Sequence, residues 1–280
     1  MESVRIGAVR YLNTAPLIEG LDQVQGLTLI PAVPSRLAPM LEAGQVDVAL
    51  ASIVDLVGGR VPLTVLPVGM IGCDGPTLTV RVFSEVPLSE VTEVCADTDS
   101  HTSVILCRLL FRRRFGRDVV IVPFDARERV VVSEGGVRSG HPSTVLLIGD
   151  KVVTDPTPAV RYPHQLDLGE AWKQETGLPF VYAAWACRAE DAEKPEIRMA
   201  AELLDRQRRH NRTRLDWIAS TRAPGARWPA DLAGKYLGTL LRYELGARER
   251  EAAERFLGMA REAGMLPHER AIAWARPLGG

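Results

Sequence analysis

The sequence lacks the close cysteine and histidine spacings that hold metal ions. It has no CxxC pair and no HExxH motif, and its five histidines are dispersed along the chain. Zinc sites in proteins are usually built from such closely spaced ligands. We therefore expect no metal site, and we expect buried, reduced thiols at Cys73, Cys95, Cys107 and Cys187.

An excess of charge is also missing. Lysine and arginine number 34 and aspartate and glutamate 35, which gives a formal net charge of -1 over 280 residues. Such a balance creates no general attraction to nucleic acid or to an anionic membrane. The basic run at residues 206–212 has no interleaved aromatic residues, unlike many nucleic-acid-binding surfaces. We expect neither nucleic acid nor a membrane as a partner.

Targeting and nucleotide-binding motifs are absent as well. No uninterrupted apolar run reaches the roughly 20 residues of a membrane-spanning helix. Met1 leads directly into the apolar run at residues 4–9, without the basic region and cleavage site of an export signal. GxGxxG and Walker A motifs do not occur, which disfavours dinucleotide and nucleoside triphosphate chemistry. These absences predict a cytoplasmic protein.

What the sequence does contain is an alternation of short β-rich runs with helical stretches up to about residue 185. The runs are rich in Val, Ile and Leu, as strands covered on both faces tend to be. This alternation predicts an α/β fold with a largely parallel sheet. The expected strands are Val4–Val9, Leu27–Val33, Val46–Ala51, Leu63–Val68, Leu78–Phe83, Glu93–Ala96, Val119–Val122, Thr144–Ile148 and Phe180–Ala184.

Helix boundaries can be located between the strands. One helix is expected to begin at Pro34 and to stop at Gly44, and another to begin at a Ser100 cap and to stop at Gly116. Beyond about residue 190 only helices are expected, namely Pro195–Arg209, Leu215–Ser220, Pro229–Leu245 and Ala247–Ala263. A chain of this kind fits two α/β lobes with the helical tail packed on one of them. A cleft between such lobes suits a small ligand that carries a carboxylate.

The segment Tyr11–Leu17, directly after the first strand, is a first candidate for anion binding. Asn13 or Thr14 could cap a helix that has Pro16 in its first turn. The free backbone N–H groups of that turn would then face the cleft. The alternative is that Asn13 only caps the helix and contacts no ligand.

The segment Thr98–Ser103 is a second candidate. Hydroxyl and imidazole side chains crowd one helix start there, where a single cap would suffice, and such an excess is typical of a carboxylate or phosphate site. The alternative is an ordinary cap with solvated neighbours, and Asp99 argues against an anion directly above it. Two weaker signals are Thr79, which follows a turn and could project into the cleft, and Gly149, which would permit close backbone approach.

A series of motifs spans nearly the whole chain. They are Arg5–Val9 followed by Tyr11–Leu17, Gly44–Leu50, Cys73–Pro76, Ser100–Val104, Leu147–Asp150, Asp167–Val181 and Lys235–Leu237. Together and in this order, they resemble the motifs of the chorismate dehydratases of the futalosine route to menaquinone.

This resemblance implies a fold, a domain division and a reaction. The fold would be a periplasmic-binding-protein-like type II clamp with mixed sheets and the C-terminal helical tail packed on the first lobe. Lobe 1 would comprise residues 1–80 plus 182–280, and lobe 2 residues 81–181, with the ligand cleft between them. The reaction would be removal of water from chorismate to give 3-[(1-carboxyvinyl)oxy]benzoate, without a cofactor.

The resemblance also implies roles for individual residues. Asn13 would orient the leaving hydroxyl, and Thr79 stands where the family commonly has a serine, so the hydroxyl is kept and a methyl is added. No general base emerges from the motifs, and Arg10 and His101 are not expected to be one. We therefore expect the enolpyruvyl carboxylate of the substrate to take the proton. The expected substrate-binding residues are Tyr11, Ser52, Ser100, Thr102, Ser103 and Gly149.

Three other functions remain open at this point. A non-catalytic binding protein for small carboxylates would share the fold but should carry an export signal. The related 1,4-dihydroxy-6-naphthoate synthase of the same pathway begins with a different motif. An effector-binding regulator would need a DNA-reading module. A homodimer is compatible with the sequence, although no feature demands one.

Overall fold

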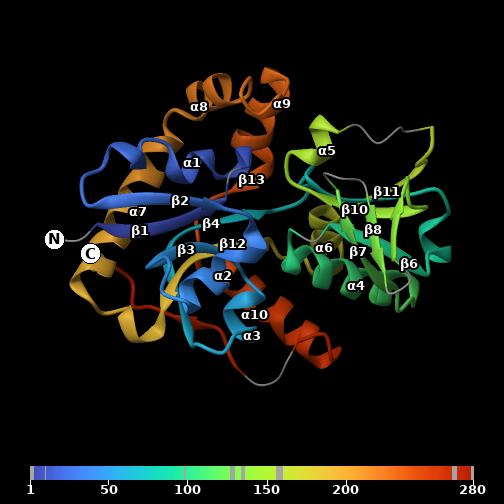
Figure 1. Cartoon of the computed structure of the whole chain (residues 1–280), viewed down its shortest axis with the longest axis horizontal. Helices are drawn as coiled ribbons and strands as arrows, with labels where there is room; N and C mark the ends of the chain where they lie inside the picture. The colour runs from blue at the N-terminus through green and yellow to red at the C-terminus, as the bar shows by residue number, and fades with distance from the viewer. Residues whose placement is uncertain are drawn as a thin grey trace.

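The computed structural model describes residues 3–9, 11–97, 99–126, 130–133, 136–155, 160–266 and 270–278. The chain forms two α/β halves that lie side by side, each built around its own sheet (Figure 1). Both sheets mix parallel and antiparallel strands, as expected. Within the described residues, no helix has the length and apolar character needed to cross a membrane.

The first sheet has seven strands in the order β13-β4-β12-β3-β1-β2, with β14 paired to β4. β1 runs parallel to β2 and β3, whereas β12 runs antiparallel to β3 and β4. The strands are β1 (Val4–Val9), β2 (Leu27–Ala32), β3 (Val48–Ser52), β4 (Leu63–Cys73), β12 (Phe180–Arg188), β13 (Leu241–Arg242) and β14 (Ala273–Trp274).

Helices from both ends of the chain cover this sheet on its two faces. The central strand β3 is buried throughout, and its residues alternate between two hydrophobic clusters, Val48 and Leu50 in one and Ala49 and Ala51 in the other. The first cluster includes residues of α1 (Ala15–Ile18) and α7 (Pro195–Arg212), and the second includes α2 (Pro34–Glu42), α3 (Asp55–Gly58) and α10 (Ala247–Glu262). The C-terminal tail therefore packs on the first sheet.

The second sheet also has seven strands, in the order β11-β5-β10-β6-β7-β8-β9. The chain enters it between β4 and β5 and leaves it between α6 and β12, so two segments join the halves. Its elements are β5 (Val80–Ser84), β6 (Glu93–Asp97), α4 (His101–Phe115), β7 (Val120–Asp125), β8 (Val130–Ser133), β9 (Gly136–Ser139), β10 (Thr144–Ile148), α5 (Lys151–Thr154), β11 (His164–Asp167) and α6 (Leu168–Thr176).

Most helix ends are where the sequence places them. The Ser100 hydroxyl accepts the N–H of Ser103 and caps α4, and Gly116 ends the helix with φ of 63°. All four cysteines are buried and free, as expected. Burial raises the pKa of the Cys107 thiol to about 12 and that of Cys73 to about 11, so neither supplies a reactive thiolate.

The structure corrects the prediction of a single helix over Pro229–Leu245. α9 (Ala230–Lys235) gives way to a π-helix, η5 (Tyr236–Leu240), and then to β13. β13 pairs with Cys73 and Gly72 at the end of β4, so backbone pairing at a sheet edge ends the helix. α8 (Leu215–Arg222) precedes this region. β13 and β14 also show that the tail is not purely helical.

Candidate active site

A cleft between the two sheets collects most of the residues singled out from the sequence. It is formed by the loops after β1 and β3, the turn before β5, the start of α4, the end of β10 and the π-helix η5. Its described lining is Val9, Tyr11, Asn13, Pro34, Ser52, Ile71, Thr77, Thr79, Val80, Ser100, Ser103, Ile148, Gly149, Tyr182, Ala183, Tyr236 and Leu241. Seven of the expected site residues therefore meet in one place.

Thr102 does not join the lining, although its neighbours do. Its side chain is completely buried, and its hydroxyl has no hydrogen-bond partner among the described residues. Successive helix residues project about 100° apart, so Ser100 and Ser103 share a face that excludes Thr102. The Ser100 and Ser103 hydroxyls are 2.9 Å apart at the positive end of α4.

The segment after β1 offers side chains to the cleft instead of backbone N–H groups. Asn13 does not cap a helix: it lies inside a short 3-10 helix (Leu12–Thr14), and its Oδ1 accepts the Thr14 hydroxyl at 3.1 Å. The Leu12 N–H was expected to be free. It donates instead to the two carboxylate oxygens of Asp150, at 3.1 and 3.3 Å. The Asn13 amide is therefore the polar group that this helix presents to the cleft.

Thr79 forms a hydrogen bond with Tyr236 of the C-terminal tail. Its Oγ1 is 2.6 Å from the Tyr236 hydroxyl, and both side chains are buried. The Tyr236 ring stacks on Trp228, at 4.7 Å between centroids, and the Trp228 indole N–H donates to Asp150 at 3.0 Å. Burial raises the pKa of Tyr236, so the phenol keeps its proton.

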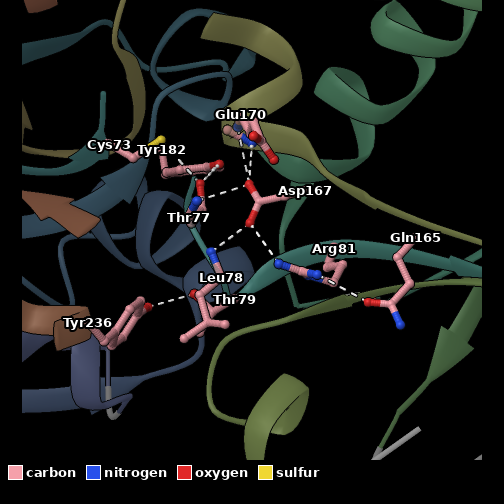
Figure 2. Close-up of polar contacts among 11 residues, drawn as sticks. Cys73, Thr77, Leu78, Thr79, Arg81, Gln165, Asp167, Glu170, Tyr182 and Tyr236 are labelled. Carbon is pink, nitrogen blue, oxygen red and sulfur yellow. Dashed lines mark hydrogen bonds and ion pairs between the residues drawn. The ribbon is translucent and has the colours of Figure 1, made fainter. Parts of the chain in front are cut away.

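The turn that carries Thr79 is held by a buried carboxylate, Asp167 (Figure 2). Asp167 accepts the backbone N–H groups of Thr77 at 2.9 Å and Leu78 at 2.7 Å, and it caps α6. Arg81 forms an ion pair with it at 3.3 Å. Leu78 has φ of 71°, a conformation that costs a branched residue free energy unless its surroundings enforce it. Asp167 therefore fixes the direction in which Thr79 projects.

Behind the cleft, one lysine neutralises two aspartates. Lys151 Nζ is 2.5 Å from Asp97 Oδ2 and 2.9 Å from Asp99 Oδ2, and Asp99 also accepts the Tyr11 hydroxyl at 2.7 Å. Burial raises the pKa of Asp97. The sequence interpretation did not include Lys151 or Asp97. The signal available in the sequence was their position at strand ends, since Asp97 is the last residue of β6 and Lys151 follows β10.

The described lining of the cleft contains several hydroxyl groups but no charged group. Of its described residues, none carries a carboxylate, imidazole, amine or guanidinium group. Asp150 lies next to the lining, and burial raises its pKa. Its carboxylate accepts hydrogen bonds from the Leu12 backbone N–H and from the Trp228 indole N–H. Asp74 is paired with Lys173 at 2.5 Å, outside the lining. Arg10 and Thr98 lie outside the described residues.

Gly149 lets the two halves approach closely. It has φ of 65°, and a Cβ atom there would be 2.9 Å from the Tyr11 ring. A carbon–carbon contact of that length is too short for an unstrained fit, so only glycine allows this distance between the β1 loop and the end of β10. Among the described residues, no cluster of three or more His, Cys, Asp or Glu side chains could hold a metal.

Comparisons with known proteins agree with this architecture. The family model for menaquinone biosynthesis matches residues 4–262. The chorismate dehydratase of Thermus thermophilus is 31% identical over 234 residues, which cover 78% of this chain and 81% of that protein. The aliphatic sulphonate binding protein SsuA of Escherichia coli matches 100% of this chain and 94% of its own, with a TM-score of 0.65 and 14% identity.

A second solved structure gives the same result for the fold. Protein AF1704 of Archaeoglobus fulgidus has a TM-score of 0.62 and 14% identity, over 94% of this chain and 98% of its own. At such identities the likeness concerns the fold alone. It is a two-lobed periplasmic-binding-protein-like fold, as the sequence motifs predict.

Proposed function

The chain belongs to the menaquinone-biosynthesis family, and from this premise we propose that it is a chorismate dehydratase acting in the futalosine route. It would remove water from chorismate to give 3-[(1-carboxyvinyl)oxy]benzoate. The observation that carries this proposal is the 31% identity to a chorismate dehydratase over 78% of the chain. The hydroxyl groups that line the cleft support it independently.

The chemistry of chorismate defines what the cleft must do. The C3 hydrogen is acidified through the ring double bond that is conjugated with the C1 carboxylate. Removing it gives an extended enolate, and loss of the C4 hydroxyl then makes the ring aromatic. An enzyme for this reaction must hold two carboxylates, stabilise the enolate and assist the departing hydroxide.

The cleft residues can be assigned to these tasks. Ser100 and Ser103, at the N-terminus of α4, would hold the ring carboxylate, where the enolate charge develops. Asn13 and Thr79, which both line the cleft, would contact the C4 hydroxyl. Tyr11, Ser52 and Gly149 would complete the substrate pocket.

The proton acceptor would be the enolpyruvyl carboxylate of the substrate itself. This assignment is supported by the described cleft lining, which contains no carboxylate, imidazole or amine. C3 carries both this hydrogen and the enolpyruvyl ether that bears the carboxylate, so the carboxylate can reach the hydrogen and the transfer needs no protein group. The protein would then act by positioning the substrate and by stabilising charge.

Asp74→Asn and Asp150→Asn test this assignment of the base. We expect the kcat of each variant to stay within about tenfold of the wild type, because a general base normally contributes about 100- to 10,000-fold. Steady-state kinetics with chorismate measure this. A fall of several orders of magnitude in kcat at unchanged KM, in either variant, would show that a protein carboxylate takes the proton.

Ser103→Ala tests the carboxylate site. Loss of a hydrogen bond to a charged group should raise KM by about 10- to 100-fold, and it should also lower kcat, because the charge on this carboxylate increases in the enolate. Thr102→Val is the matched control, since it removes a neighbouring hydroxyl that is buried and does not line the cleft. Equal effects of the two substitutions on KM would contradict the assignment.

We also propose how the two halves work together. Residues 1–80 plus 182–280 would form lobe 1 and residues 81–181 lobe 2, hinged at the two connecting segments. The likeness to binding proteins of the clamp type supports this division. The enzyme would act in the cytoplasm without a cofactor, and would bind neither nucleic acid nor a membrane. Self-association as a homodimer stays a prediction.

Incubation of the purified, metal-free protein with chorismate, followed by chromatography and mass spectrometry, tests the proposed function. We expect an aromatic enolpyruvyl ether that is lighter than chorismate by one water. Tight binding of unchanged chorismate would favour a non-catalytic carboxylate-binding protein. Turnover of a different pathway intermediate alone would favour the related 1,4-dihydroxy-6-naphthoate synthase.

A further inference from the structure

We propose that Tyr236 is a positioning residue of the dehydration, which turns the Thr79 hydroxyl so that its hydrogen points at the departing C4 oxygen. The inference rests on the proposed function. Tyr236 comes from the C-terminal tail, about 150 residues away from Thr79 in the chain, and the two hydroxyl oxygens are 2.6 Å apart.

The direction of the hydrogen bond between Tyr236 and Thr79 follows from the burial of the phenol. A buried hydroxyl group needs an acceptor for its hydrogen. In the described part of the chain, the hydrogen-bond partner of the Tyr236 hydroxyl is the Thr79 hydroxyl.

The hydrogen of Tyr236 is then available for Thr79. The phenol therefore donates its own hydrogen to Thr79 Oγ1. A hydroxyl that accepts one hydrogen bond still has its own hydrogen to donate. In the described part of the chain, Thr79 Oγ1 has Tyr236 as its hydrogen-bond partner, so the Thr79 hydrogen is left for a ligand in the cleft.

The surroundings of Tyr236 hold it in this arrangement. Its side chain is 1% exposed, and its ring stacks on Trp228 at an interplanar angle of 19°. Trp228 is tied to Asp150, and Tyr236 begins the π-helix that interrupts the tail. Single π-turns are uncommon and occur often at functional sites. Here the π-turn directs a tail residue to the cleft.

The reaction balances without any net proton from Tyr236 or Thr79. The C3–H bond breaks, and its proton goes to the enolpyruvyl carboxylate. The electron pair forms the enolate, the C4–O bond breaks, and the ring becomes aromatic. The leaving oxygen then receives the proton taken from C3 and departs as water. Thr79 stabilises the developing hydroxide by hydrogen bonding, and burial keeps Tyr236 protonated throughout.

Tyr236→Phe, measured in D2O as well as in water, tests the inference. We expect kcat to fall about tenfold at nearly unchanged KM, because the variant loses one neutral hydrogen bond, the one between Tyr236 and Thr79. Slower C4–O cleavage should also make C3 deprotonation reversible. Unreacted chorismate recovered from D2O should therefore carry deuterium at C3, and the isotope effect of C3-deuterated chorismate should shrink.

Tyr243→Phe is the control, since its buried hydroxyl has no hydrogen-bond partner among the described residues and lies outside the cleft lining. It should leave kcat, exchange and isotope effect at wild-type values. If Tyr236→Phe fails to fold, Trp228→Phe replaces it, because it loosens the packing against the Tyr236 ring and should produce the same exchange to a smaller extent.

Each outcome has a distinct meaning. Wild-type protein that does not convert chorismate would overturn the proposed function. Wild-type turnover with an unchanged Tyr236→Phe variant would overturn this inference alone. A lower kcat without deuterium exchange and with an unchanged isotope effect would assign Tyr236 a merely structural role, and would also overturn the inference.

Discussion

Replacing Thr79 by valine should lower kcat for chorismate by about 100- to 1000-fold, the usual cost of one donor to a developing oxyanion. Valine matches threonine in shape, so packing in this buried position is kept. What is lost is the hydroxyl that joins Tyr236 to the cleft. Because that donor acts on charge that develops only at the transition state, KM should change by less than about threefold.

Thr79→Ser is the matched control for this variant. The hydroxyl is retained, so kcat should stay within about tenfold of the wild type. Steady-state kinetics of the three proteins measure the difference. A valine variant with the kcat of the serine variant would show that the Thr79 hydroxyl does not take part in the reaction.

Replacing Asp167 by alanine should destabilise the protein by about 3–5 kcal/mol, as expected when one partner of a buried, hydrogen-bonded ion pair is removed. The carboxylate accepts four backbone N–H groups, those of Thr77, Leu78, Gly169 and Glu170, and it pairs with Arg81. Alanine leaves these donors without an acceptor, and those of Thr77 and Gly169 are buried. Equilibrium unfolding in guanidinium chloride measures the change.

Asp74→Asn serves as the control, since Asp74 lies near the same turn but forms a partly exposed ion pair with Lys173. Its loss should change the free energy of unfolding by less than about 1 kcal/mol. Asp167→Ala should also lose activity, because the turn that aims Thr79 is no longer held. A stable Asp167→Ala variant with wild-type kcat would contradict the role given to this carboxylate.

Local signals account for the parts of the fold that the sequence predicts. The apolar runs at Val4–Val9 and Thr144–Ile148 coincide with observed strands, and the Ser100 cap and Gly116 stop bound α4. These features depend on a few neighbouring residues. The short strands β8, β9 and β11 were not predicted. β11 (His164–Asp167) is too short and polar for an apolar pattern.

The parts of the site that the sequence did not predict depend on distant partners. Asp150 accepts the Leu12 N–H, which is 138 residues away in the chain. No sequence pattern near residue 12 indicates this hydrogen bond. Tyr236 was noted only as part of a motif, because the helical pattern around it gave no sign of a π-turn. Thr102 is different, since helical geometry alone separates it from Ser100 and Ser103.

The most direct test is the time course of water loss from chorismate with wild-type protein and Thr79→Val at equal concentration, beside an enzyme-free control. The account predicts that the wild type forms 3-[(1-carboxyvinyl)oxy]benzoate and that the valine variant is slower by about 100-fold or more. Equal rates for the two proteins, or no product from the wild type, would contradict dehydration of chorismate in this cleft.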